Sequence, residues 1–275
     1  MKLYVDSRHR TAGTNESFVW QIPETVDIPD SQVYIDCVLV PNVFFSATDD
    51  NNTIFFLEEV VSSPGGGAVI TPRQAVIANG QYNGLTLATA VQASMQAAGA
   101  YGSALTVEFD LASSKLKVSL SAPHESQVRI YPDGALDQWN AAQGVYQTDL
   151  NNTKSAGKLC GFLGTVSLVA STSLFTLGDS VIDVQRHHCC YIHSDIADPG
   201  SSFGCRGQSD VIRRVVVDAV QNSLAIDRFT TSWDSVEVGA RSLRSMEFRL
   251  ADDNGNTVNL QGHHWSFSLV FHDKL

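Results

Sequence analysis

The chain has 275 residues, 43% of them hydrophobic, and it carries a formal net charge of −11 at pH 7. This length and this apolar fraction are sufficient for one large all-β domain or two small ones, and they exclude disorder over most of the chain. The acidic balance argues against nucleic acid as the main partner, because a phosphate-binding surface needs clustered positive charge.

The cysteines and the N-terminus indicate a protein made inside a cell. Five cysteines follow no spacing typical of secreted disulfide frameworks, and their number is odd, so we expect reduced thiols. The first ten residues, MKLYVDSRHR, lack the apolar stretch of a signal peptide, and polar residues interrupt every apolar run well short of a membrane span. We therefore expect neither secretion by the usual route nor a membrane-spanning segment.

A short basic segment opens the chain. It contains the one basic cluster of the sequence, made by Lys2, Arg8, His9 and Arg10. Clustered charge at a terminus is typical of a solvated arm, and it also suits a strap that grips a neighbouring subunit. The sequence leaves both interpretations open.

Three strands are predicted in the N-terminal third. Apolar and polar residues alternate at 17–22 and at 32–39, as in strands with one buried face. In the second of these we expect Val38 on the face opposite the apolar set, which consists of Val33, Ile35, Cys37 and Leu39. The third strand is predicted at 53–61, where a glycine-rich break at 62–67 ends it.

The region 68–164 differs from its surroundings because it contains the one predicted helix. Between residues 85 and 98, apolar side chains recur at steps of three and four, which places them on one helix face. Alternating residues at 105–120 predict a β-hairpin, and residues 132–157, rich in Asp, Asn, Gln and Gly, predict an exposed loop. We expect a small α+β insertion here.

Strands resume at residue 165 and continue to the end. They are predicted at 165–170, 181–193, 211–217 and 225–230, and two more lie within 241–271, where the alternation covers 245–250 and 265–271. The last two are expected to form a closing hairpin with a type I′ turn at Asn254-Gly255, since such turns need positive φ at two positions. Many short strands and scarce helix favour an antiparallel β-sandwich of the Greek-key or jelly-roll kind.

Several motifs resemble chemical sites, but each is explained better as structure. The run 186–193 holds two imidazoles and two thiols, yet neighbouring strand residues face opposite sides, so His187 with Cys189 and His188 with Cys190 make only half of a zinc site each. His263-His264 has the same difficulty, and residues 252–256 lack the late Glu of a calcium loop. Residues 204–207, Gly-Cys-Arg-Gly, suggest either a reactive thiol or a loop, and the loop is favoured.

The sequence therefore assigns no catalytic, cofactor-binding or metal-binding residue. It contains no GxSxG elbow, no recognised cysteine-protease signature, and no phosphate-binding loop after Gly65-Gly66-Gly67. A pair of acids for glycoside hydrolysis is set by the fold and not by spacing, so the sequence does not test it. We expect a protein that is not an enzyme and that uses no cofactor.

Three segments together resemble one family. They are LYVDSRHRTAGTNESFVWQIP at 3–23, NGQYNGLTLATAVQASMQ at 79–96 and SLRSMEFRLADDNGNTVNLQGHHWSFSLVF at 242–271. Their order along the chain is similar to that in the penton, or vertex minor capsid, proteins of virophages, polinton-like viruses and related double-stranded DNA viruses. The short phrases YIHSD at 191–195 and CGFLG at 160–164 add to this resemblance.

The resemblance implies a single jelly roll, at 1–67 and 165–275, interrupted by the insertion 68–164. It implies a homopentamer at each icosahedral fivefold vertex, in contact with the major capsid protein and with other minor capsid proteins, in virions assembled in the infected host cell. A closed ring needs two different patches on each subunit, and outward apolar residues such as Val19, Val38 and Val270 would suit that packing.

Two other function classes remain open. One is a glycan-binding or receptor-binding β-sandwich of the lectin-like or fibre-head kind, which would use the loops 132–157 and 196–210. The other is an enzyme of cupin or lyase type, which the missing ligand set disfavours.

Overall fold

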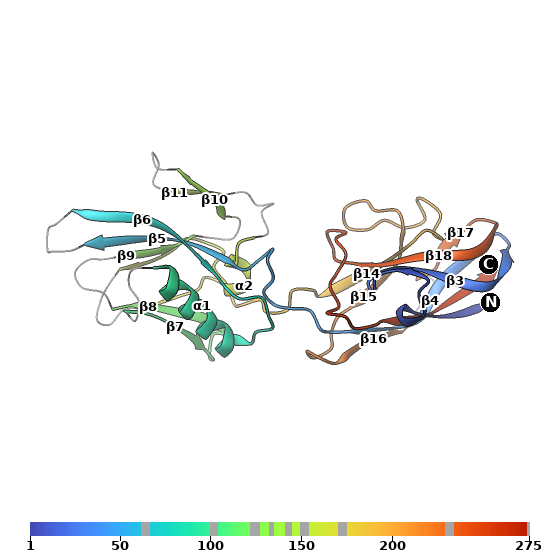
Figure 1. Cartoon of the computed structure of the whole chain (residues 1–275), viewed down its shortest axis with the longest axis horizontal. Helices are drawn as coiled ribbons and strands as arrows, with labels where there is room; N and C mark the ends of the chain where they lie inside the picture. Colours follow the sequence, from blue (N-terminus) through green and yellow to red (C-terminus); the bar gives the residue numbers. More distant parts are fainter. Residues whose placement is uncertain are drawn as a thin grey trace. The chain divides into compact units, whose positions relative to one another are not determined.

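The chain forms two units, and each has a hydrophobic core of its own. The computed structural model describes residues 1–61, 67–99, 104–121, 127–131, 135–140, 145–148, 154–169, 175–228 and 234–273. One unit combines Met1–Phe44 with His187–Leu275, and the other is the single segment Phe45–Arg186. Both chain termini belong to the first unit (Figure 1).

The first unit is a sandwich of two five-stranded antiparallel sheets. The first sheet contains β1 (Lys2–Asp6), β19 (Ser266–Asp273), β4 (Ser31–Pro41) and β16 (Leu224–Arg228) in that order, with β17 (Val236–Val238) also paired to β4. The second sheet contains β15 (Val211–Val216), β14 (Cys189–Ser194), β18 (Arg241–Ala251), β3 (Ser17–Ile28) and β2 (Ala12–Gly13).

The strand order of this unit is that of a jelly roll. Along the chain the principal strands are β1, β3, β4, β14, β15, β16 with β17, β18 and β19. Numbered in this way, one sheet has the order 1-8-3-6 and the other has the order 2-7-4-5. These two orders result when paired Greek keys close into a sandwich. The prediction of an all-β jelly roll is confirmed, and the other unit is inserted between its third and fourth strands.

Four aromatic rings pack across the two sheets of the jelly-roll unit. Phe18 and Phe248 come from β3 and β18, whereas Phe267 lies on β19 and Trp265 comes directly before it. Phe248 meets Phe267 edge-on at 4.8 Å between ring centroids, and Phe18 meets Trp265 edge-on at 5.6 Å. Since all four side chains are buried, this cluster joins the sheets at the centre of the core.

The predicted closing hairpin is wrong, although both of its strands exist. β18 pairs with β3 and β14, whereas β19 pairs with β1 and β4 in the opposite sheet. The predicted alternation of buried and outward residues is confirmed for both strands, because the apolar faces of β18 and β19 point into one core. They face this core from opposite sheets.

The turn after β18 is also of another type than predicted. Only Gly255 has positive φ there, whereas a type I′ turn needs two such residues. The Gly255 amide donates to the Asp252 carbonyl at 3.1 Å, and the Asp252 amide donates to the Asn256 carbonyl at 2.9 Å. This pattern is typical of the three-residue loop in which a left-handed glycine closes a type I turn.

A β-bulge in β4 reverses which residues face the core. Ser268 of β19 pairs with Cys37, but the next residue, Leu269, pairs with Ile35, so Asp36 is the extra residue. An extra residue shifts the alternation by one position. After Asp36 the core therefore receives Val38 and Val40 instead of the predicted Cys37 and Leu39.

The N-terminal basic segment is part of the sandwich and not an arm. Residues 2–6 form the edge strand β1, where the Lys2 ammonium pairs with Asp36 of β4 at 2.5 Å. Arg8 pairs with Asp6, and Arg10 donates to the backbone carbonyls of Ser7 and Gly13. The prediction of a solvated arm is wrong, because residues 2–6 are a paired strand, whereas contact of this segment with a neighbouring subunit stays a prediction.

The inserted unit is an α+β unit. One sheet has the order β12 (Val166–Val169), β9 (Gln127–Ile130), β5 (Thr53–Val61) and β6 (Ala68–Val76), and another has β13 (Phe175–Leu177), β8 (Lys115–Leu120) and β7 (Leu105–Asp110). The remaining elements are α1 (Gly84–Ala98), α2 (Gly157–Cys160) and the pair β10 (Ala135–Asn140) with β11 (Val145–Thr148).

The predicted helix and the predicted 105–120 hairpin are both present. The Asn83 side chain accepts from the Thr86 amide at 3.0 Å, and the Thr86 hydroxyl accepts from the Asn83 amide at 2.9 Å, so a capping box begins α1. Leu87, Val91 and Met95 of the helix are buried in the core of this unit.

The boundaries of this unit differ from the predicted 68 and 164. β5 lies inside it because β5 pairs with both β6 and β9. Residues 165–186 also belong to it, since β12 pairs with β9 and β13 pairs with β8. The strand predicted at 181–193 is correspondingly shorter and begins at Cys189. Part of the predicted loop 132–157 forms β10 and β11, and 132–134, 141–144 and 149–153 lie outside the described residues.

The aromatic cluster yields a stability prediction. Replacing Phe248 by Ala removes a fully buried ring that contacts both Phe18 and Phe267. We expect a loss of about 3 to 4 kcal/mol in the free energy of unfolding, measured by urea denaturation followed by circular dichroism. Ser245→Ala, at an exposed position of the same strand, should change it by less than about 0.5 kcal/mol. Equal effects of the two substitutions would contradict the assigned role of the cluster.

Candidate functional site

The outer face of β14 brings thiol, phenol, imidazole and carboxylate side chains together. Cys189, Tyr191 and His193 alternate along this strand and so share one face. The loop 203–210 supplies Cys205 and Asp210 to the same face, as their hydrogen bonds to Tyr191 and His193 show. We call these five residues the β14 outer face.

Two thiols approach the hydroxyl of Tyr191. The Cys205 sulfur lies 3.0 Å from Tyr191 Oη, and the Cys189 sulfur lies 3.7 Å from it. The hydrogen bond with Cys205 and then burial raise the pKa of Tyr191 well above its ordinary value, because both favour the neutral phenol. The hydroxyl is therefore held protonated between the two sulfur atoms.

His193 is the other buried group of this face. Its Nδ1 lies 2.7 Å from Asp210 Oδ1, and the second oxygen of that carboxylate lies 3.7 Å from the Arg249 guanidinium. Arg249 also donates to the Gly255 carbonyl at 2.7 Å, which fixes its position. The carboxylate thus orients the imidazole and ties the loop to the sheet.

The other histidines and the remaining cysteine of the 186–193 run are not gathered into a site. The His187 ring packs edge-on against Phe44 at 4.9 Å, and Cys190 is buried in the core on the opposite side of β14. His263 approaches the Leu260 carbonyl, and His264 approaches the Ser7 hydroxyl. In the described ranges, no three His, Cys, Asp or Glu side chains lie close enough together to hold a metal ion.

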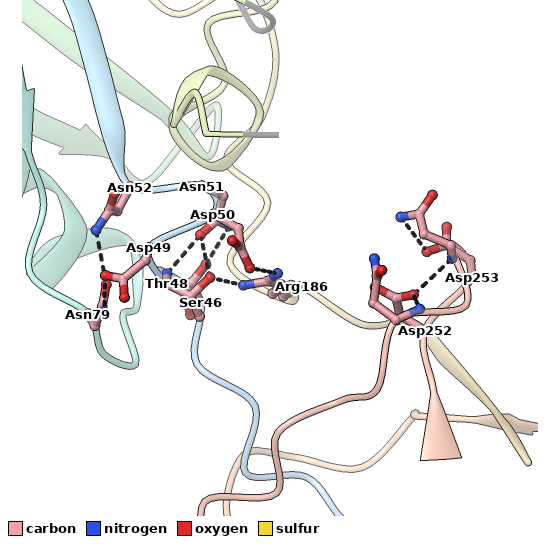
Figure 2. Close-up of polar contacts among 12 residues, drawn as sticks. Ser46, Thr48, Asp49, Asp50, Asn51, Asn52, Asn79, Arg186, Asp252 and Asp253 are labelled. Atoms are coloured by element: carbon pink, nitrogen blue, oxygen red, sulfur yellow. Dashed lines mark hydrogen bonds and ion pairs between the residues drawn. The ribbon is translucent and has the colours of Figure 1, made fainter. Parts of the chain in front are cut away.

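Two pairs of neighbouring aspartates, Asp49-Asp50 and Asp252-Asp253, lie among groups of their own chain to which they bind (Figure 2). In the jelly-roll unit, Asp252 Oδ1 accepts from the amides of Asn254 and Asn256 at 2.9 and 2.8 Å. These bonds are those of a turn and not of a calcium loop.

The other aspartate pair, Asp49-Asp50, lies where the start of the inserted unit meets its end (Figure 2). Arg186 pairs with Asp50 at 3.2 Å and also donates to the Thr48 hydroxyl. The Ser46 hydroxyl donates to the Val184 carbonyl at 2.7 Å. These bonds close the unit where the chain enters and leaves it.

Arg213 bridges the two sheets of the jelly-roll unit, which the sequence did not predict. From β15 it donates to Asp227 of β16 at 2.9 Å and to Asp234 at 2.6 Å, and its side chain is only 8% exposed. Burial works against the charge, but the two carboxylates outweigh it and hold the pKa of Arg213 above its ordinary value. The sequence signal that could have revealed this bridge is the presence of a charged residue within the otherwise apolar run 211–217.

The first sheet of the jelly-roll unit has exposed apolar side chains on both of its edge strands. Tyr4 of β1 is 75% exposed, and Leu224 and Ile226 of β16 are 53% and 52% exposed. Val19 and Val270, expected on outer faces, are half-buried, whereas Val38 lies in the core. Both edges thus offer apolar surface.

Removal of the Arg213 bridge should destabilise the jelly-roll unit. Arg213→Ala leaves two carboxylates without their shared cation, and we expect a loss of about 2 to 3 kcal/mol in urea denaturation, since both aspartates are partly exposed. Arg214→Ala, at the exposed neighbouring position, serves as the control and should cost less than about 0.5 kcal/mol. A small effect at both positions would show that the bridge is not structurally important.

The protonated Tyr191 hydroxyl gives a pH dependence. Because its pKa in the folded chain lies above the ordinary value of about 10, folding retains a proton that the unfolded chain loses. Its contribution to stability is complete below pH 10 and declines as the pH rises further. We expect the midpoint of urea unfolding to fall less steeply above pH 10 in Tyr191→Phe than in the wild type. Parallel curves would contradict the raised pKa.

Comparison with known proteins identifies the fold and not the family. No protein-family model and no curated protein matches the chain. Among solved structures, the chain is similar to the crystal structure of the mavirus penton protein, with a TM-score of 0.54 over the whole of both chains and 9% sequence identity. None of the described helices is long and apolar enough to cross a membrane. The fold of this chain is thus similar, along its full length, to that of a penton protein.

Proposed function

We propose that this chain is a structural virion protein, a penton subunit at the icosahedral fivefold vertices of a DNA-virus capsid. The observation that carries the proposal is the similarity to the mavirus penton protein, which extends over all of both chains and so includes the inserted unit as well as the jelly roll. A match confined to the jelly roll would carry less weight, because that fold serves many functions.

The edge strands of the first sheet support assembly into a ring. A closed ring of identical subunits needs two different patches on each subunit, since every interface is heterologous. β1 and β16 lie at opposite ends of the row β1-β19-β4-β16, and both carry exposed apolar side chains. Apolar side chains of this exposure favour burial against a partner. In the proposed homopentamer, the β16 edge of one subunit faces the β1 edge of the next.

The proposal extends to further partners and to a place in the particle. The subunit contacts the major capsid protein around each vertex, together with other minor capsid proteins, and it is incorporated into virions in the infected host cell. In this proposal the unit Phe45–Arg186, which is inserted between β4 and β14 and has a core of its own, is a domain on the outer side of the capsid. No catalytic step is part of this function.

Mass photometry of the purified chain tests the proposal, with and without the major capsid protein. We expect pentamers alone, or monomers that become pentamers when that protein is added. A stable trimer that binds glycans would contradict the penton and favour the receptor-binding alternative. Density at the fivefold axis of intact particles, fitted by this chain, would give the independent answer.

A charge on the β16 edge should prevent ring formation. Ile226→Asp places a carboxylate in the proposed interface at a half-exposed position, so the isolated fold is expected to remain intact. We expect pentamers to be reduced at least tenfold at a concentration where the wild type is assembled. Val76→Asp, 61% exposed on β6 of the other unit, is the matched control and should assemble normally. Equal assembly of both variants would place the interface elsewhere.

A further inference from the structure

Two of the five cysteines are held next to each other by one side chain. Cys189 and Cys205 both approach the Tyr191 hydroxyl, at 3.7 and 3.0 Å, so the two sulfur atoms share one oxygen atom as a neighbour. Cys189 is half-buried and Cys205 is exposed. Cys160 and Cys190 differ from this pair, because both are fully buried and burial raises the pKa of each thiol.

The two cysteines also differ in how firmly the backbone holds them. Cys189 begins β14 and pairs with Val216 of β15, and β18 pairs with the same strand from Tyr191 onward. Cys205 lies in a tight turn closed by the Gly207 amide, which donates to the Gly204 carbonyl at 3.0 Å. Gly207 has a φ of +81°, in the left-handed region that glycine adopts without strain. Cys205 thus lies in a hydrogen-bonded loop turn, whereas Cys189 lies in a strand of the sheet.

We propose that Cys189 and Cys205 are an oxidisable pair that forms a disulfide and fastens the loop 203–210 to β14. The oxidant in this reaction is a small-molecule disulfide such as oxidised glutathione. The ionised sulfur of Cys205 attacks one sulfur of the reagent and releases one glutathione thiolate. The ionised sulfur of Cys189 then attacks the Cys205 sulfur of the mixed disulfide and releases the second glutathione thiolate. The two released thiolates take up, through solvent, the two protons that the cysteines lost, so two cysteine thiols are oxidised and one small disulfide is reduced to two thiols.

Formation of this bond requires Tyr191 to move. Bonded sulfur atoms lie about 2.05 Å apart, so the Tyr191 hydroxyl must give up its contacts with the two sulfur atoms. Tyr191 is only 9% exposed, so its buried ring has to shift as the bond forms. His193 and Asp210 already hold the end of the loop to the same strand, at 2.7 Å. The crosslink therefore ties a segment that is already docked.

The crosslink would matter for a particle that leaves the cell, a consequence that rests on the proposed function. Thiols stay reduced inside cells and are oxidised outside them. A subunit could thus be assembled with a free loop and be stiffened after release. A disulfide stabilises mainly by restricting the unfolded chain, so the oxidised jelly-roll unit should melt at a higher temperature.

The test is thiol counting in the purified full-length chain. After incubation with oxidised glutathione and removal of the reagent, we expect titration in denaturant to find three thiols instead of the five in the sequence. Mass spectrometry should identify a peptide crosslinked between Cys189 and Cys205. Cys189→Ser and Cys205→Ser should each abolish the crosslink, while Cys37→Ser, in the other sheet, should keep it.

A melting experiment supplies the second readout. The oxidised wild type should melt several degrees higher than the reduced protein, and Cys205→Ser should show no such difference. Five titratable thiols, a stable glutathione adduct on Cys205, or a disulfide between two chains would each overturn the proposal. Oligomeric state does not enter these readouts, so failure here is distinguishable from failure of the penton proposal.

Discussion

The jelly-roll unit depends on the aromatic contact between its two sheets. Phe18 and Phe248 approach from one sheet, and Phe267 and Trp265 approach from the side of the other. Because successive residues of a strand point to opposite faces, the residues adjacent to these aromatic side chains point away from the cluster, so the cluster also fixes which face of each strand is outward. The half-exposed surface offered by β1 and β16 and the β14 outer face are both consequences of that orientation.

Insertion of a large unit between β4 and β14 is compatible with this core because the inserted chain begins and ends at one place. Ser46 bonds to the Val184 carbonyl, and Arg186 pairs with Asp50, so the unit closes upon itself. Its helix and sheets have a core separate from the aromatic cluster. A unit with adjoining ends and its own core imposes little strain on the strands that flank it. β14 therefore keeps its place in the sheet directly after the insertion, and the side chains of the β14 outer face keep their positions.

Period two predicts that a strand exists and which residues share a face, but it does not predict the partner strand. The alternation in β18 and β19 was read correctly, yet the two strands lie in different sheets, because either arrangement buries the same faces. The bulge at Asp36 shows a second limit, because period two does not reveal where an extra residue interrupts a strand. One extra residue exchanged Cys37 for Val38 in the core, and nothing in the local composition marks such an insertion.

The β14 outer face was only half predictable for a related reason. The strand pattern places Cys189 on the same side as Tyr191 and His193, but Cys205 and Asp210 come from a loop whose path depends on tertiary contacts. The loop is tied to the sheet by a backbone hydrogen bond from the Ser194 amide to the Asp210 carbonyl and by side-chain contacts from His193 to Asp210, from Arg249 to Asp210 and from Tyr191 to Cys205. These contacts are noncovalent, whereas a covalent bond at the same place would not depend on salt or pH. A loop held by noncovalent contacts and bearing an exposed thiol near a second thiol is therefore suited to being fixed by oxidation. The same loop in a protein without Cys189 would have to rely on the polar contacts alone.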